Sequence, residues 1–437
     1  MKLRITAIDL FERPVPFTHP FRFGAVTVDG APQAYVRVVA EVDGHGPATG
    51  GSAELMVPKW FDKDPAKTPA QTIDDLRTSL LLAAGAYRGA YGTAFAIHAD
   101  RHAAHVAACG ALGLPPLVAA YGMAELDKAV LDALCRAAGL GAWAALGANL
   151  PGLDARLTPD LDDAGIAAFL ATARPVPSMP IRHAVGYLDD VAALPGTLVA
   201  TGCRYVKLKL SGDPAADRIR LMAIAAALPA DVLGASLDAN EQYDSAALPA
   251  LHAILDDPAL RPIRERLIYV EQPVARGTLA LGEFAAAFPC VMDEGDDSYA
   301  AFPDALRAGW RGVSVKSCKG PYKGLLNALR AQRAGAMLTS EDLTAQPGLA
   351  LQQDLALAAF LGLPHGERNG HCYTAGFADA DEAARFGQAH PTLYDGMRLR
   401  VEGGTLPTGG LGAAIGYGTA AHPDWAALPP LRTPAPN

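Results

Sequence analysis

The chain has 437 residues and a mass of 45.4 kDa, which is more than one ordinary domain needs, so it can bury a large core. Half of its residues are apolar and 19% are charged, a composition that excludes a disordered or fibrous chain. The net charge is −9 and Lys and Arg are not clustered, which excludes a surface for nucleic-acid phosphates. We therefore expect no nucleic-acid partner.

The cysteines and the N-terminus indicate the compartment. The six cysteines are far apart and show neither a CxxC pair nor the Cys/His spacing of a zinc motif, so we expect reduced thiols and no zinc site. The first residues lack the apolar core of a signal peptide, and no run of about 18 uncharged apolar residues follows. We therefore predict a cytoplasmic protein that does not enter a membrane.

The N-terminal part of the chain is predicted to be α+β. Turn signals at Asp29-Gly30 and Asp43-Gly44 separate three segments rich in β-formers, residues 3–12, 33–42 and 48–54. Helical apolar spacing and strong helix formers then predict three helices, over residues 72–91, 94–109 and 124–138.

From about residue 180 the sequence repeats one arrangement, a short apolar run that ends in charged residues and is followed by enough chain for a helix. The first strand candidate spans residues 180–185. The gaps between the later charged ends are 29, 33, 22, 23 and 25 residues, and the ends are Lys209, Asp238, Glu271, Asp293, Lys316 and Glu341. This period predicts a parallel β/α barrel, in which the C-terminal ends of the strands meet on one face, where active sites are built.

Lys207 and Lys209 are two residues apart on one predicted strand, so both side chains point to the same face. Two ammonium groups held close together disfavour each other's protonation, and a nearby Mg²⁺ adds to this effect. One of the two lysines can therefore act as a base near neutral pH, and the sequence does not decide which. The ordinary alternative is a solvated pair on an edge strand.

Three carboxylates, Asp238, Glu271 and Asp293, close three successive predicted strands. A single aspartate after a strand is usually a helix cap or a turn residue, but three in register form a different pattern. Carboxylate oxygens that leave positions open for water and substrate suit Mg²⁺. The sequence therefore predicts a magnesium site, with Asn240 placed to hold Asp238 or the substrate.

Lys316 ends the sixth predicted strand, across the barrel mouth from Lys209. It is either the acid/base partner on the opposite face of the substrate or a cation that balances the carboxylates. Lys319 and Lys323 follow in the next loop or first helical turn, and we predict that both are surface residues.

Together these motifs resemble the enolase superfamily, specifically its mandelate racemase/muconate lactonizing enzyme group. The matching motifs occur in order along the barrel: Lys207-Leu208-Lys209, Asp238-Ala239-Asn240, Val270-Glu271-Gln272-Pro273, Asp293-Glu294 and Lys316. The resemblance implies an α/β fold, a modified (β/α)7β TIM barrel with an α+β capping domain. We place the cap at residues 1–125, the barrel at 126–375, and a C-terminal segment that packs on the cap at 376–437.

The resemblance also implies roles for the charged residues. Asp238, Glu271 and Asp293 are implied to bind Mg²⁺, which holds a substrate carboxylate. Lys209 is implied to remove the proton α to that carboxylate, with Lys207 assisting and Lys316 acting from the other face.

Substrate contacts are expected from both parts of the protein. Pro20-Phe21-Arg22-Phe23-Gly24 looks like the mobile specificity loop of the cap, and Trp60 and Phe61 are expected to close over the site, unless these aromatic residues only pack the cap on the barrel. The substrate-binding candidates are Arg22, Phe23, Asn240, Ser340 and Glu341. Relatives of this family also suggest a homo-oligomer.

The end of the seventh strand, Thr339-Ser340-Glu341-Asp342, lacks the histidine of the acid-sugar dehydratase and mandelate racemase branches. The layout resembles the lysine/lysine branch, which includes cycloisomerases, racemases and epimerases. We therefore predict an enzyme that uses Mg²⁺ to remove the α proton of a small carboxylate through a metal-stabilised enolate, giving racemisation, epimerisation or cycloisomerisation. Two alternatives stay open: dehydration of an acid sugar or hydroxy acid, and a barrel that binds metal and ligand without turnover.

Overall fold

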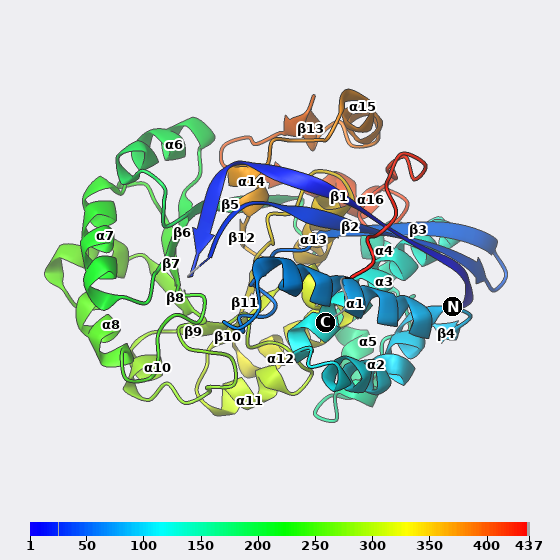
Figure 1. Ribbon diagram of the computed structural model, residues 1–437, viewed down its shortest axis with the longest axis horizontal. Helices are drawn as coiled ribbons and strands as arrows, with labels where there is room; N and C mark the ends of the chain where they lie inside the picture. The colour runs from blue at the N-terminus through cyan, green and yellow to red at the C-terminus, as the bar shows by residue number, and fades with distance from the viewer. Residues whose placement is uncertain (25, 435–437) are drawn as a thin grey trace.

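The computed structural model describes residues 1–24 and 26–434. An antiparallel sheet with its helices lies beside a parallel barrel that is surrounded by helices (Figure 1). The N-terminal end lies on the side of the antiparallel sheet.

The antiparallel sheet forms the cap and has the strand order β3-β2-β1-β4. Val36 and Val38 of its second strand are fully buried, as expected for a sheet with one covered face. The strands are β1 (Lys2–Phe23), β2 (Val26–Val42), β3 (Gly46–Leu55) and β4 (Tyr91–Thr93).

β1 and β2 extend farther than predicted and form a long hairpin. The expected turn at Asp43-Gly44 is confirmed, but Asp29-Gly30 lies inside β2, so that turn prediction was wrong. Gly30 is needed there because a Cβ would lie 2.6 Å from the Val15 carbonyl oxygen of β1. Residues 20–23, expected to be a loop, are the end of β1, and the chain turns at Gly24, whose φ of 50° suits glycine.

The cap helices are α1 (Pro69–Tyr87), α2 (Ala94–Ala111) and α3 (Pro116–Ala138). α3 packs on β2 and β3, and the other two helices pack on α3. α1 begins before the predicted start because Thr68 and Gln71 form a capping box. The domain boundary expected at 125/126 falls inside α3, so the part that packs as the cap continues at least to residue 138.

Eight parallel strands of the described chain close into a barrel, in chain order, with the last strand paired to the first. They are β5 (Ser178–Val185), β6 (Tyr205–Lys209), β7 (Gly234–Asp238), β8 (Leu267–Glu271), β9 (Cys290–Met292), β10 (Gly312–Val315), β11 (Met337–Ser340) and β12 (Gly366–Glu367). The predicted modified TIM barrel with an α+β cap is therefore confirmed.

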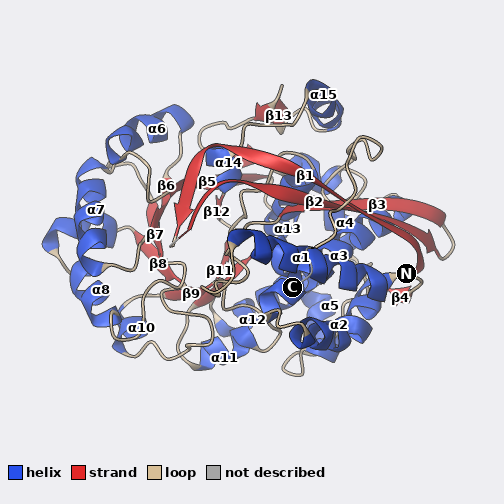
Figure 2. Ribbon diagram, viewed as in Figure 1, coloured by secondary structure: helices blue, strands red, loops and turns tan. Residues whose placement is uncertain are grey.

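Helices surround the barrel strands in Figure 2. α13 is buried along its whole length because it lies between the barrel and β3 of the cap. The helices are α4 (Ala142–Gly147), α5 (Asp163–Ala171), α6 (Leu194–Thr201), α7 (Pro214–Ala227), α8 (Leu248–Leu255), α9 (Arg261–Arg264), α10 (Glu283–Ala287), α11 (Ala301–Arg307), α12 (Pro321–Ala334) and α13 (Leu349–Phe360). The short 3-10 turns are η1 (Ala155–Leu157), η2 (Val191–Ala193), η3 (Pro258–Leu260) and η4 (Ser317–Lys319). None of the helices in the described ranges is long and apolar enough to cross a membrane.

The C-terminal segment packs on both the barrel and the cap. It follows the short helix α14 (Asn369–Tyr373), and its own elements are α15 (Ala380–Ala389), β13 (Tyr394–Asp395), β14 (Arg398–Leu399), β15 (Thr405–Pro407) and α16 (Gly409–Ala413). β15 pairs antiparallel with β5 of the barrel. Farther on, Pro430 bridges to Phe11 of the cap sheet, and the rings of Trp425 and Phe11 lie 5.8 Å apart. The tail therefore ties the two parts together.

Candidate active site

The charged ends of the barrel strands meet at one end of the barrel. Parallel pairing places Lys209 beside Asp238, and Asp238 beside Glu271. Asp293 directly follows β9, and Lys316 directly follows β10. All six predicted catalytic and metal-binding residues are buried. The barrel thus brings together residues from five different strand ends.

Lys207 lies at the centre of this cluster. Its Nζ donates to Glu341 Oε2 at 2.7 Å, to Glu367 Oε2 at 2.7 Å and to Glu271 Oε1 at 3.0 Å. Asp238 Oδ2 lies 2.9 Å from the same nitrogen. Burial alone lowers the pKa of Lys207, but the neighbouring carboxylates outweigh it and raise this pKa well above its ordinary value. Lys207 therefore remains an ammonium ion in this arrangement.

Lys209 lies on the same face of β6 and nearer to the cap. Its Nζ lies 2.5 Å from Asp238 Oδ2 and 3.2 Å from Asn240 Oδ1. The ring centroid of Phe21, from the cap hairpin, is 5.7 Å away. Burial raises the pKa of Asp238, but Lys207 and Lys209 outweigh it and bring this pKa to about 2. Asp238 is therefore an anion shared by both lysines.

Asp293 is held by two lysines from the other side of the barrel. Lys316 Nζ donates to Asp293 Oδ2 at 2.6 Å, and Lys319 Nζ donates to Oδ1 at 3.1 Å. The prediction that Lys319 and Lys323 are surface residues was wrong, since they are only 2% and 4% exposed. Both point inward because the η4 turn and the start of α12 direct them to buried carboxylates, Asp293 for Lys319 and Asp296 for Lys323.

Two further charged residues, Arg182 and Glu367, complete the cluster, and the sequence analysis did not select either of them. Arg182 of β5 donates to Glu341, which also accepts from the Tyr269 hydroxyl at 3.0 Å. Burial raises the pKa of Glu367 to about 8, although Lys207 and Lys209 act against it. Glu367 lies 26 residues after Glu341, which continues the spacing of the strand ends and was the available signal. Its strand has only two residues, so no apolar run marked it.

A small closed cavity separates the charged cluster from the cap. Its volume is about 20 Å³, room for water molecules only. The lining residues are Phe21, Phe23, Val57, Trp60, Lys209, Asn240, Lys316, Asp342, Leu343, Thr344 and Glu367. The cap supplies the first four, and the rest come from the ends of barrel strands. The structure therefore shows a closed site, and a substrate can enter only if the cap segments move.

Lys209 and Lys316 face this cavity from opposite sides. Their strands, β6 and β10, are four positions apart in the ring of eight strands formed by the described residues. Lys316 Nζ also lies 4.2 Å from the centroid of the Trp60 ring, so the cap contacts this lysine directly. Lys207 is not among the lining residues.

The five substrate-binding candidates have different positions. Phe23 and Asn240 line the cavity, whereas Arg22, Ser340 and Glu341 are not among its lining residues. The Arg22 guanidinium lies 5.5 Å from the ring centroid of Tyr187. Ser340 accepts a hydrogen bond from Arg368 at 2.6 Å, and Glu341 is engaged as described above.

Asn240 is held by the cap as well as by the barrel. Its backbone has a φ of 44°, a left-handed conformation that asparagine tolerates better than most residues. Lys63 Nζ, from the segment after β3, donates to the Asn240 carbonyl oxygen at 2.6 Å and to Glu294 Oε1 at 2.8 Å. The Asn240 amide donates to the same Glu294 oxygen at 3.1 Å. Closure of the cap and the position of Asn240 are therefore coupled.

The complete architecture matches that of solved structures. A mandelate racemase/muconate lactonizing protein from Herpetosiphon aurantiacus is similar with a TM-score of 0.66 and 21% identity, covering 95% of this chain and 98% of that one. The chain has the fold of the enolase superfamily. A muconate lactonizing enzyme from Pseudomonas fluorescens, complexed with muconolactone, has a TM-score of 0.63 and 17% identity and covers 95% and 96%. A dipeptide epimerase from Enterococcus faecalis, complexed with Mg and a dipeptide, has a TM-score of 0.61 and 17% identity and covers 95% and 99%.

The likeness to the mandelate racemase/muconate lactonizing enzyme group lies in the structure. No protein-family model matches the chain, and no curated protein is significantly similar to it in sequence. The motifs by which the sequence resembles the superfamily lie at the barrel strand ends of this fold, around the cavity beneath the cap.

Within this enolase-superfamily fold, the carboxylates have the donor chemistry of a magnesium site. Asp238, Glu271 and Asp293 offer hard oxygen ligands. Burial raises the pKa of Glu271 well above its usual range, Asp238 and Glu341 add to the effect, and the nearby Lys207 ammonium offsets it only in part. Glu271 Oε2 makes no hydrogen bond, and its charged neighbour is Lys207 Nζ at 2.9 Å. A divalent cation at these oxygens would add positive charge beside Glu271 and would give its Oε2 atom a ligand bond.

Lysine ammonium groups hold these carboxylates apart. The only three His, Cys, Asp or Glu ligand atoms within 4.8 Å of one another in the described chain lie elsewhere. A cation at Asp238 and Asp293 would therefore take over contacts now made by Lys209 and Lys316.

Proposed function

We propose that this chain is a magnesium-dependent enzyme of the enolase superfamily that removes and returns the proton α to the carboxylate of a small substrate. The products would be those of racemisation, epimerisation or cycloisomerisation. The observation that carries the proposal is the presence of Lys209 and Lys316 on opposite sides of one closed cavity. An epimerase and a muconate lactonizing enzyme among the similar structures support this class of reaction.

Lys209 is the proposed base on one face of the substrate, and Lys316 is the acid or base on the other. Both residues line the cavity, which places them beside a substrate held there. Lys207 has four carboxylates around its nitrogen and does not line the cavity, so it positions the cluster instead of transferring the proton.

The lysines must lose a proton before either can act as a base. In the closed structure Lys209 forms an ion pair with Asp238, and Lys316 forms one with Asp293. Burial lowers the pKa of Lys316, but Asp293 outweighs it and raises this pKa. If Asp293 turns to a cation, the effect of burial on the pKa of Lys316 is no longer outweighed, and its neutral amine becomes accessible.

When bound, Mg²⁺ supplies the positive charge that stabilises negative charge developing on the substrate carboxylate. The residues that would hold it are Asp238, Glu271 and Asp293. The chain itself contributes apolar surroundings, because the buried side chains of Phe21, Phe23 and Trp60 line the cavity on its cap side and separate it from bulk water.

The test is hydrogen exchange in D₂O with Mg²⁺ and a pooled library of acylated amino acids, dipeptides and hydroxy acids, read by mass spectrometry. We expect one deuteron to be gained at the α-carbon of the substrate. With purified enantiomers, Lys209→Met and Lys316→Met should each abolish exchange from one hand, and the two variants should differ in the hand affected. Lys2→Met, an exposed lysine on β1, is the matched control.

Undiminished exchange in Lys209→Met would show that Lys209 is not the base. Tight, Mg²⁺-dependent ligand binding without exchange or product would show a barrel that binds but does not turn over.

Dehydration of a hydroxy acid is a second candidate, and the state of Glu367 favours it. This side chain lines the same cavity and, with a pKa of about 8, is protonated at neutral pH. A protonated carboxyl group can expel hydroxide as water. Loss of water to give a 2-keto acid would support this reaction, and recovery of the intact substrate with scrambled configuration would exclude it.

A further inference from the structure

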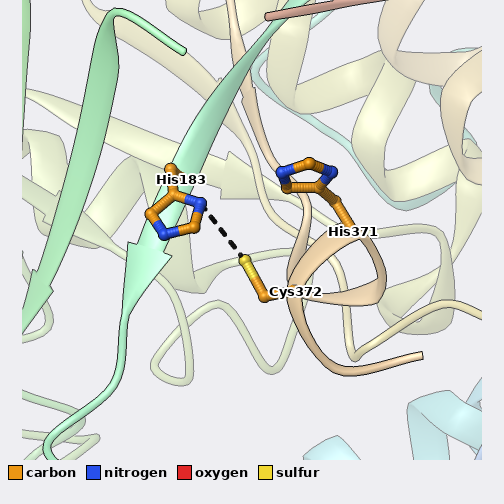
Figure 3. A group of neighbouring side chains, drawn as sticks. All are labelled: His183, His371 and Cys372. Atoms are coloured by element: carbon orange, nitrogen blue, oxygen red, sulfur yellow. Dashed lines mark hydrogen bonds between the residues drawn. The ribbon is translucent and has the colours of Figure 1, made fainter. Parts of the chain in front are cut away.

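A second group of ligand-type side chains lies outside the candidate active site. His183 of β5 and His371 and Cys372 of α14 each offer one ligand atom, and the three atoms lie within 4.8 Å of one another. Figure 3 shows the three side chains around a common space, with Cys372 directed at the His183 ring. The Cys372 Sγ and His183 Nδ1 atoms are 3.5 Å apart.

The distances are close to those of a tetrahedral zinc centre. Zn–S and Zn–N bonds of about 2.3 Å and 2.1 Å place sulfur and nitrogen roughly 3.5 Å apart. The Cys372–His183 pair already has this separation, and the His371 ligand atom lies within 4.8 Å of both, so its imidazole has at most about 1.3 Å to approach.

The protonation of the two imidazoles also suits metal binding. Burial lowers the pKa of His183 to about 4, and the neighbouring His371 adds to this effect. Burial also lowers the pKa of His371. Both rings are therefore neutral at physiological pH, with a nitrogen lone pair available. The Cys372 thiol keeps its proton in the metal-free chain because burial raises its pKa.

A cavity of about 510 Å³ borders all three residues. Asp189 and Asp190 line it as well, and their carboxylates attract cations. The cavity gives an ion a route to the three side chains and leaves room for water as a fourth ligand.

We propose that His183, His371 and Cys372 bind one Zn²⁺ ion, separately from the magnesium carboxylates, with the fourth coordination position open to the cavity. On binding, a Zn–S bond replaces the S–H bond, and the thiol proton leaves to solvent. The sequence predicted no zinc site because it contains no cysteines and histidines at the close spacing of a zinc motif. Here His183 is 189 residues from Cys372, and barrel closure brings them together.

The proposed zinc site would fasten α14 beneath the cap hairpin. Tyr373, next to Cys372, packs against Phe21 of the hairpin with ring centroids 4.3 Å apart. The Tyr373 ring also lies 4.6 Å from the His19 ring. Zinc would therefore hold the surface on which the hairpin tip rests, and this role does not depend on the proposed reaction.

The test uses the full chain with Mg²⁺ in excess, so that the carboxylate site is occupied. We expect equilibrium dialysis against Zn²⁺ to leave one zinc ion per chain. With Co²⁺ in place of Zn²⁺, we expect a thiolate-to-cobalt charge-transfer band, which carboxylate ligands do not produce. This spectrum is recorded on the wild-type chain, so the test does not depend on the folding of a variant.

Cys372→Ser should remove the cobalt band, and His183→Gln and His371→Gln should reduce bound zinc to background. The matched control is Cys109→Ser. Cys109 Sγ also lies 3.5 Å from a histidine, His105 Nε2, but the described chain places no second imidazole with this pair. Cys109→Ser should keep both the zinc and the band.

Two outcomes would overturn the proposal. One is that excess Mg²⁺ displaces all zinc and all cobalt from the wild-type chain. The other is a cobalt spectrum without a thiolate band, or with a band that persists in Cys372→Ser.

Discussion

Two clusters in this protein bury lysines among carboxylates, one in the cap and one in the barrel. In the cap, Lys128 of α3 lies 2.8 Å from Glu125 Oε1 and 3.3 Å from Glu54 Oε2. In the barrel, Lys207 Nζ lies 3.0 Å and 2.9 Å from the two carboxylate oxygens of Glu271. For both lysines, burial lowers the pKa and the carboxylates reverse the effect. Burial and unusual pKa values therefore do not distinguish the two.

The difference between the clusters is access. Lys128 and its partners lie between α3 and β3, and none of the three lines the cavity beneath the hairpin. In the barrel cluster, Lys209, Lys316 and Glu367 reach that cavity. A buried ion pair becomes a candidate for catalysis only when one of its members can meet a substrate.

The largest contrast is expected from removing one cavity lysine. Lys209→Met should lower the rate of α-proton exchange by about 10³-fold, because general acid–base groups contribute on this scale. Lys128→Met should leave the rate per folded molecule unchanged. The measurement is deuterium incorporation, normalised to folded protein by circular dichroism. Comparable losses in both variants would show that the cap cluster is not merely structural.

The reverse contrast should appear in stability. Lys128→Met leaves Glu54 and Glu125 buried without their cation, so we expect the free energy of unfolding to fall by about 3 kcal/mol in urea titrations. Adding Glu125→Gln to Lys128→Met should recover part of this loss, because one unpaired carboxyl is removed. A double variant less stable than the single one would contradict this account.

Stability should depend on pH through one carboxyl of each cluster. Glu54 and Glu367 both have a pKa of about 8, raised first by burial. The folded chain keeps their protons while the unfolded chain loses them above the ordinary glutamate pKa of 4.5. Stability therefore falls as the pH rises from about 5 to about 8.

Glutamine in place of Glu54 or Glu367 removes the contribution of that carboxyl group to the pH dependence of stability. The stability of Glu54→Gln and of Glu367→Gln, relative to wild type, should rise across this window by up to about 1.4 kcal/mol per pH unit. Only Glu367→Gln should also change the pH–rate profile. A changed profile in Glu54→Gln would remove the distinction between the clusters.

The smallest effect is expected at the cap side of the cavity. Trp60→Leu removes the ring that lies 4.2 Å from Lys316 Nζ. A cation–π contact of about 1 kcal/mol corresponds to roughly a fivefold change in kcat/KM, and Trp60→Phe should keep most of it. An unaltered rate in Trp60→Leu would mean that the ring only fills space.

The sequence by itself determined the barrel and its charged strand ends. Local patterns sufficed, because an apolar run followed by a charge marks the end of each strand, and parallel strands place these ends on one face. Lys209, Asp238 and Glu271 could be placed side by side for this reason, and their pairing has the expected register.

Tertiary structure alone decided the cavity and its other members. Glu367 belongs to a two-residue strand that exists because β12 pairs with β5 at barrel closure, and Arg182 is its neighbour there. Residues 21–23 are a strand because they pair with β2, and Lys319 is buried because it forms an ion pair with Asp293. Each depends on residues far away in the chain, and such contacts leave no local pattern of apolar and polar residues.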